Sequence, residues 1–307
     1  MSGRERVRQV ARAVSAPWRQ QAARAVSAPW RQQAARAWRR RWAGAMRMAW
    51  PLGGLALGLL AALPVAAAEW VRMDLNRQGN EVRVLVHNLA AGPVEVELQA
   101  GWLQDMAAQP ALPHRRVLAA GAREQVALLV MTGPAPRHEL TLLAVPGPPY
   151  AVARDVVYSL PVEESAFRLG QGFHGGFSHD DPANRYALDL EVAEGTAVLA
   201  ARGGMVMEAI GGFSEGGLDR TLADRANLVR VLHEDGSMAL YAHLREGGVT
   251  VRPGQAVSLG QVLGYTGNTG FSSGPHLHFA VQVNAGMRLE SVPFRMIGPE
   301  GLLPLGH

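Results

Sequence analysis

With 307 residues, the chain exceeds the usual size of one domain, which predicts two folded units and an N-terminal leader. A formal net charge of +4 suggests an acidic partner such as nucleic acid, but 12 of the 30 basic residues lie in residues 1–68, with Glu5 as the one acid there. Residues 69–307 hold 18 arginines and 25 acidic residues, which argues against nucleic acid. Cysteine is absent, so a metal site must use histidine and carboxylate ligands.

Residues 1–68 read as a basic leader and signal sequence. An apolar stretch over residues 48–63 is followed by small residues that resemble a signal-peptidase site after Ala68. The pattern predicts an exported protein of the periplasm or cell envelope. An uncleaved membrane anchor is the alternative, because the uncharged run just reaches the roughly 20 residues that cross a bilayer.

A perfect tandem repeat precedes the apolar stretch, since residues 12–23 recur unchanged as residues 24–35. We interpret the repeat as a recent duplication; an amphipathic arm on a membrane surface is the alternative. Met46 could itself open a conventional signal peptide, so we hypothesise that translation starts there. A cleavage-blocked precursor that begins at Met1 would contradict this.

Residues 69–160 are expected to form a β-sandwich of short strands. Apolar and polar residues alternate over residues 81–87, which places Val82, Val84 and Val86 on one buried face. Further strands are expected at residues 93–98, 125–130 and 139–143. No cluster of polar residues in this part of the sequence suggests chemistry, so we interpret the domain as a spacer or docking module.

Residues 161–307 follow stiff, Pro-containing connecting segments and are rich in glycine, with almost no helical periodicity. Strands are expected at residues 196–200, 205–210, 228–232, 238–243, 261–265 and 276–283. The predicted fold class is therefore all-β: an N-terminal β-sandwich domain followed by a mostly antiparallel β domain.

Two histidines in residues 274–281 give the most informative chemical signal. Side chains alternate along a strand, so His276 and His278 point to the same face, at a separation that suits two groups acting at one metal centre. A His-x-His pair alone is a weak signal, because both residues can simply be exposed.

A second signal lies in residues 178–190. His179 sits in a polar loop, whereas Asp189 lies between two leucines in an apolar strand. Burying a lone carboxylate is costly, so a metal or a hydrogen-bond donor should lie near Asp189. An ion pair with Arg185 is the structural alternative, and Asp180 and Asp181 are interpreted as solvated loop charges.

A third signal is His243 at the end of an apolar strand, which alone is more typical of a core residue. Together the three segments resemble the lysostaphin-type (LytM-like) zinc metallopeptidases, whose pattern runs from His and Asp through a His-containing strand to His-x-His. The resemblance covers about residues 165–295 and includes residues 195–198, 251–257 and 267–270.

The resemblance implies that His179, Asp189 and His278 bind zinc and that His243 and His276 are the catalytic histidines. Three protein ligands leave a fourth position for water. Zinc lowers the pKa of that water and polarises the scissile carbonyl. A neutral imidazole can take the proton, and a second can stabilise the oxyanion or protonate the leaving amine.

The sequence departs from the commonest family pattern at one place. Nine residues separate His179 from Asp189, where many members have three, so His174 is a rival ligand. The Ser-His followed by Tyr-Ala-x-Asp resembles a longer-spaced branch of the family and favours His179. Tyr241 is expected either in the core or in a substrate groove, and residues 211–225 are expected to wall the cleft.

The resemblance implies an endopeptidase that hydrolyses peptide cross-links of bacterial peptidoglycan, with peptidoglycan peptides as substrate and the membrane contacted only through an uncleaved N-terminus. The alternative is a non-catalytic or autoinhibited LytM-like regulator that acts with a protein partner, although all five motif positions hold the expected residue types. A biotinyl or lipoyl carrier is excluded because the chain has no lysine. The Gly-x-Ser-x-Gly at residues 212–216 lacks the context of a nucleophile elbow.

Overall fold

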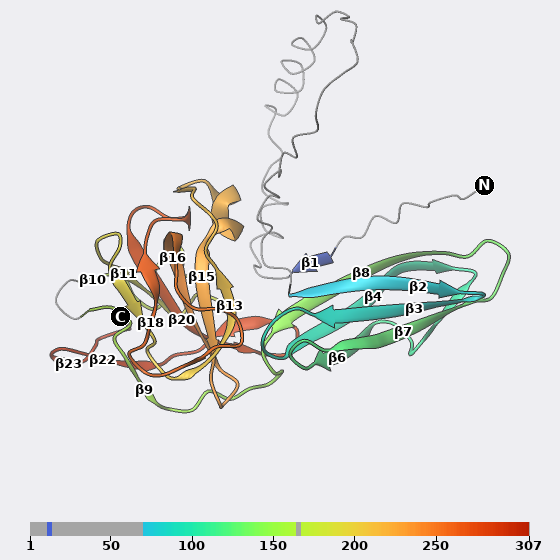
Figure 1. The fold of residues 1–307 in the computed structure, drawn as a ribbon, viewed down its shortest axis with the longest axis horizontal. Helices are drawn as coiled ribbons and strands as arrows, with labels where there is room; N and C mark the ends of the chain where they lie inside the picture. The colour runs from blue at the N-terminus through green and yellow to red at the C-terminus, as the bar shows by residue number, and fades with distance from the viewer. Residues whose placement is uncertain (1–10, 14–69, 164–166, 307) are drawn as a thin grey trace, which may run out of the picture. The chain divides into compact units, whose positions relative to one another are not determined.

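The computed structural model describes residues 11–13, 70–163 and 167–306 (Figure 1). The expected cleavage site, the apolar stretch and most of the repeat lie outside the described residues. The division at residue 160 stays a prediction. In the described part of the chain, no helix is long and apolar enough to cross a membrane.

Two four-stranded sheets form the N-terminal domain in the described residues (Figure 1). One sheet has the order β1, β8, β4, β6 and the other the order β2, β3, β7, β5; neighbours are antiparallel except for the β1 and β8 pair. The strands are β1 (Ala11–Ala13), β2 (Val71–Gln78), β3 (Glu81–Asn88), β4 (Val94–Gln104), β5 (Met106–Gln109), β6 (His114–Leu118), β7 (Arg123–Met131) and β8 (Arg137–Pro146).

Alternating apolar residues join these two sheets. Val82, Val84 and Val86 of β3 are buried, as their alternation predicts, and they share one hydrophobic cluster with Val94 and Val96 of β4. β3 and β4 present every second side chain to this core, because successive side chains point to opposite faces. The sheets therefore pack face to face, as in a sandwich.

A larger, mostly antiparallel sheet forms the second domain, in the order β10, β11, β20, β16, β15, β13, β17, with β12, β18 and β21 paired beside it. Its strands are β10 (Arg168–Gln171), β11 (Ala187–Glu191), β12 (Ala197–Leu199), β13 (Gly204–Ile210), β15 (Asn227–Leu232), β16 (Met238–Val249), β17 (Ala256–Val257), β18 (Val262–Thr266), β20 (His276–Asn284) and β21 (Leu289–Ser291). Six of these match the six strands expected from the sequence. The all-β class is confirmed.

Short elements complete the described residues. They are the strands β9 (Val157–Ser159), β14 (Gly216–Gly217), β19 (Gly270–Phe271), β22 (Arg295–Gly298) and β23 (Gly301–Leu302), and the 3-10 helix η1 (Arg220–Arg225). β14 pairs with β19, and β22 pairs with β9 and β23. Residues 212–216 therefore lead into a two-residue strand, so the structure lacks the packed helix that a nucleophile elbow requires.

The two faces of the large sheet differ in character. Leu188 and Leu190 of β11 face a large hydrophobic core, together with Phe279 of β20. The opposite face carries a small cluster of Ala187, Leu240, Ala242 and Ala280. Asp189 lies between Leu188 and Leu190, so its side chain points to the face that carries the small cluster.

Candidate metal and catalytic site

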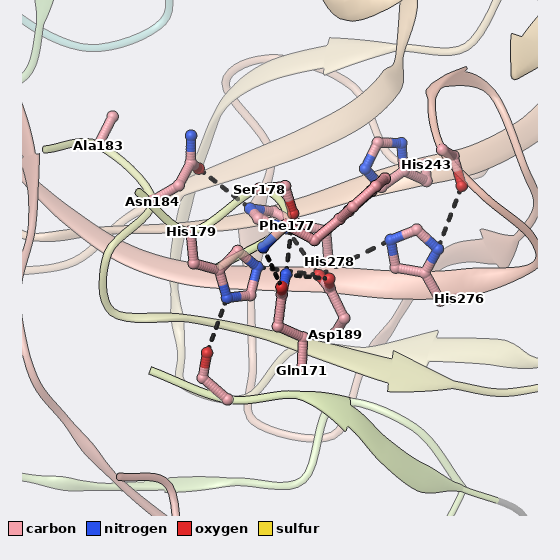
Figure 2. A network of polar contacts seen from close by, with 12 residues as sticks. Gln171, Phe177, Ser178, His179, Ala183, Asn184, Asp189, His243, His276 and His278 are labelled. Carbon is pink, nitrogen blue, oxygen red and sulfur yellow. Dashed lines mark hydrogen bonds and ion pairs between the residues drawn. The ribbon is translucent and has the colours of Figure 1, made fainter. Parts of the chain in front are cut away.

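Asp189 on β11 lies directly opposite His278 on β20 in the antiparallel register. Paired residues project to the same face, and His276 projects to that face as well because it lies two residues before His278. The ladder thereby brings together a carboxylate and two imidazoles that are far apart in the sequence. The same-face arrangement expected for the His-x-His pair follows from the backbone (Figure 2).

His243 reaches this face through an irregularity in β16. Tyr241 and Leu244 both belong to the large core although they are three residues apart, and the pairing with β15 shifts register between Asn227 and Leu228. His243 adopts a positive φ of 65°, which is uncommon for a residue with a side chain. At this shift β16 has one residue more than β15, which makes a β-bulge. The bulge redirects the imidazole of His243, as β-bulges do near functional sites.

His179 joins the cluster from the loop before β11. Its Nε2 lies 3.2 Å from Asp189 Oδ1, and the Nδ1 of His278 lies 2.9 Å from the same oxygen (Figure 2). One ligand atom from each of these three residues lies within 4.8 Å of the other two. Two imidazoles and a carboxylate are a ligand set that catalytic zinc sites use.

In His179 and His278, a hydrogen bond to an oxygen acceptor fixes which ring nitrogen carries the proton. The acceptor is a backbone carbonyl for His179 and a side-chain amide oxygen for His278. His179 donates from Nδ1 to the carbonyl of Gly172 at 2.8 Å, which leaves the lone pair on Nε2. His278 donates from Nε2 to Oδ1 of Asn184 at 3.1 Å, which leaves the lone pair on Nδ1. The unprotonated nitrogens are the two that face Asp189, so the donors present fit a metal ion.

The two oxygens of Asp189 have different partners. Gln171 donates from Nε2 to Oδ2 at 3.0 Å, while Oδ1 faces His179 and His278. The Oε1 of Gln171 accepts from the backbone N–H of Phe177. The amide therefore holds one carboxylate oxygen and directs the other toward the imidazoles.

Two further imidazoles lie beside this cluster, with ring centroids 4.6 Å apart. His243 donates from Nδ1 to the carbonyl of Thr269 at 2.7 Å, and His276 donates from Nδ1 to the carbonyl of Gly274 at 2.8 Å. In both rings the Nδ1 bond leaves Nε2 available, and the Nε2 of His276 lies 3.7 Å from Asp189 Oδ1. Both histidines can accept a proton in the site.

Burial and local charge set the protonation states. Burial raises the pKa of Asp189, but its contacts with His179 and His278 outweigh burial and hold this pKa well below its usual range. Burial lowers the pKa of His278, and burial together with the charge of His276 lowers the pKa of His243 to about 3. Burial alone would lower the pKa of His179, but Asp189 outweighs it and raises this pKa. His243 and His278 are therefore neutral at pH 7.

The structure brings together all five residues singled out from the sequence. The rival His174 is exposed, and its ring packs on Tyr186 at 4.9 Å. Tyr241 is fully buried and accepts a hydrogen bond from the backbone of Ala201, so it is a core residue. The interpretation as a solvated loop charge fits the exposed Asp180, but the half-buried Asp181 differs, because its carboxylate accepts from Ala183 N and Asn184 Nδ2.

The residues that hold the site in place cannot be identified from the sequence alone. They are Gln171, Asn184 and Thr269, each of which bonds a member of the cluster. Thr269 also donates from Oγ1 to the carbonyl of Leu244, which fixes the bulge that carries His243. Asn184 lies inside the polar segment already singled out, but only the fold shows that it meets His278.

Part of this chain is similar in sequence to known peptidases. Residues 183–289 match the model of peptidase family M23. The chain is 34% identical over 115 residues to glycyl-glycine endopeptidase ALE-1 of Staphylococcus capitis, covering 37% of this chain and 27% of that protein. It is 34% identical over 95 residues to peptidoglycan DD-endopeptidase ShyA of Vibrio cholerae, covering 31% of this chain and 19% of that protein.

Among solved structures, the catalytic domain of lysostaphin from Staphylococcus simulans aligns with 28% identity over 40% of this chain and 90% of that chain, at a TM-score of 0.30. The chain spans 27% and 19% of the length of the two curated relatives above. The family match begins at residue 183, after His179, so the place of His179 rests on the geometry alone. The sequence matches confirm the resemblance to lysostaphin-type peptidases, and residues 183–289 of the second β domain are similar to peptidase family M23.

Proposed function

We propose that the protein is a zinc-dependent endopeptidase that hydrolyses peptide cross-links of bacterial peptidoglycan. One observation carries the proposal: five side chains meet at one face of the sheet, and their hydrogen bonds leave one carboxylate oxygen and four imidazole nitrogens available to a metal ion or a substrate. His179 Nε2, Asp189 Oδ1 and His278 Nδ1 would hold the zinc. The names of the relatives support peptidoglycan as the substrate.

A zinc ion held there would supply Lewis acidity to the scissile carbonyl and to the attacking water. His243 is neutral at pH 7 and holds a free Nε2, so it can take a proton from the water or return one to the leaving amine. His276 lies beside it and can exchange a proton or stabilise a developing oxyanion. The carbonyls of Thr269 and Gly274 keep both rings oriented for this chemistry.

The proposed place of action is the periplasm or the cell envelope, reached through the signal sequence in residues 1–68. The part of the chain after residue 68 carries more acidic residues than arginines, so an acidic wall would not attract it electrostatically. Recruitment would then depend on specific contacts, supplied by the second β domain, by the N-terminal domain or by a protein partner.

The direct test measures the release of new amino groups from purified peptidoglycan by residues 69–307, with and without a chelator and after zinc is restored. We expect release that a chelator stops and that His276→Ala abolishes. His174→Ala is the matched control, because this exposed histidine lies outside the cluster and its loss should leave the rate unchanged.

The alternative function is that of a non-catalytic or autoinhibited regulator of other wall hydrolases. A folded, zinc-loaded protein that releases no amino groups would contradict the endopeptidase and favour this alternative. Stimulation of a second wall hydrolase by that protein would then separate the regulator from an inactive preparation.

A further inference from the structure

A turn over residues 181–184 holds Asn184 in one orientation against His278. The carboxylate of Asp181 accepts from the Nδ2 of Asn184 at 2.8 Å and from the backbone N–H of Ala183 at 2.7 Å. With its Nδ2 fixed in this way, Asn184 presents Oδ1 to the Nε2 of His278. The turn thereby keeps the proton of His278 on Nε2 and its lone pair on Nδ1.

The same turn is tied to the far end of β20 by Gln282. The Nε2 of Gln282 donates to the carbonyl of Ala183 at 2.8 Å, and Gln282 is only 2% exposed. Gln282 lies four residues after His278 on the same strand, so both side chains project to the same face of the sheet. Water has little access to replace a lost partner here.

A buried ion pair continues the contacts beyond Gln282. The Nη1 of Arg230 donates to the Oε1 of Gln282, and its Nε lies 3.1 Å from the Oε2 of Glu208. Arg230 is 4% exposed and Glu208 is 7% exposed, and the two face each other across β15 and β13. A buried charge that loses its partner is strongly destabilised, so neither residue is free to move alone.

The last link belongs to the N-terminal domain. Trp70, directly before β2, donates from its indole Nε1 to the Oε1 of Glu208 at 3.0 Å, and Arg230 lies 6.0 Å from the centre of its ring. Each oxygen of Glu208 thus has its own donor. Ala183 also packs into the hydrophobic cluster that fills the sandwich.

We propose that the N-terminal domain positions the metal ligand His278 through this buried polar chain, which runs from Trp70 through Glu208, Arg230 and Gln282 to the turn that carries Asn184. The inference rests on the proposed function in assuming that His278 binds zinc. The chain's members are positioning residues. They touch no substrate, and they act on the orientation and tautomer of one imidazole. The sandwich is then a structural part of the metal site.

The test measures the zinc dissociation constant of the full chain carrying Gln282→Met or Trp70→Phe. Gln282→Met keeps the volume but cannot bond Ala183 or Arg230, and Trp70→Phe removes the indole donor. Loss of an outer partner of a metal ligand typically weakens binding 10- to 100-fold, so we expect about tenfold for Gln282→Met and about threefold for the more distant Trp70→Phe.

Glu95→Ala is the matched control. Glu95 also joins the sandwich to β20, since its Oε2 accepts from Asn284 Nδ2 and Met287 N, but it makes no contact with the turn among the described residues. Its loss should lower the free energy of unfolding without changing zinc affinity. Asn284 keeps a second bond to the carbonyl of Gly147, which favours folding of the variant.

Unchanged zinc affinity in folded Gln282→Met and Trp70→Phe would overturn the inference, and so would equal weakening by Glu95→Ala. If Trp70→Phe does not fold, Gln282→Glu decides: it still accepts from Arg230 but cannot donate to Ala183, so it should weaken zinc binding.

A wild-type protein that binds zinc but cuts no peptidoglycan would end the proposed function and leave the inference intact. A wild-type protein that binds no zinc would overturn both.

Discussion

Asp189 and His278 face each other across the β11 and β20 ladder, with 2.9 Å between carboxylate Oδ1 and ring Nδ1. Neither residue needs a flexible loop to reach the other, since register alone sets their separation. Any metal that uses both ligands is therefore bound to the most regular part of the domain.

The first prediction concerns the charge of this pair. Asp189→Asn keeps the shape of the side chain but removes the negative charge and presents a weaker ligand oxygen. We expect zinc affinity to fall by more than the roughly 100-fold that marks the upper range for outer partners. Competition with a chromogenic chelator measures the zinc affinity. Asp180→Asn, an exposed acid beside His179, is the control and should bind zinc as the wild type does.

The second prediction concerns the tautomer of His278. In Asn184→Ala the acceptor for its Nε2–H is missing, so the proton should divide between the two ring nitrogens. Nitrogen chemical shifts of the metal-free imidazole measure this directly. A ring that stays protonated on Nε2 in the variant would show that Asn184 does not select the tautomer.

The third prediction separates catalysis from metal binding. His243→Gln should lower the rate of peptidoglycan cleavage by about 10²- to 10⁴-fold, the range expected for loss of a general acid or base, while zinc binding stays intact. Thr269→Val should give a smaller loss, because the backbone carbonyl that orients His243 remains and the change removes only the hydroxyl, with its bonds to the carbonyl of Leu244 and the N–H of Asn227. Equal loss of zinc in His243→Gln would place this residue among the ligands instead.

The fourth prediction concerns stability against pH at a histidine outside the site. Burial lowers the pKa of His233 to about 4, with Arg202 adding to the effect, while its bond to the carbonyl of Gly203 opposes it. Between about pH 6.5 and 4 the unfolded chain binds a proton that folded His233 does not, so the free energy of unfolding falls as the pH falls. The loss attributable to this group reaches about 3 kcal/mol near pH 4.

Urea unfolding from pH 7 to pH 4 measures this contribution. His233→Asn keeps a donor for Gly203 but has no group that titrates in this range, so its stability should fall less steeply than that of the wild type. Parallel curves for the two proteins would contradict the prediction.

The sequence predicts strands well in this protein because one face of each is buried. Val82, Val84 and Val86 alternate with polar residues, so the pattern reports burial directly. The β-bulge in β16 at His243 has no pattern of this kind in the sequence. Tyr241 and Leu244 both enter the core, and the shift between them comes from the pairing with β15, which joins residues distant in sequence.

The residues that hold the site in place are hidden from the sequence for the same reason. Gln171 lies 18 residues from Asp189, and Asn184 lies 94 residues from His278. Glutamine and asparagine in polar segments are typical of solvated loops, and only the fold gives these amides their partners. The contact of Trp70 with Glu208 joins residues 138 positions apart, so no local sequence pattern could predict it.

The nine residues between His179 and Asp189 form a segment that is bonded along its length. The N–H of His179 donates to the carbonyl of Gly175, the N–H of Arg185 donates to the carbonyl of Asp181, and the backbone N–H of Ser291 holds Pro182 from a separate strand. A tethered segment has already lost its conformational freedom on folding. Capture of a metal ion would then require little additional ordering. The longer spacing should therefore lower the rate and the affinity of metal binding much less than a flexible loop of the same length would.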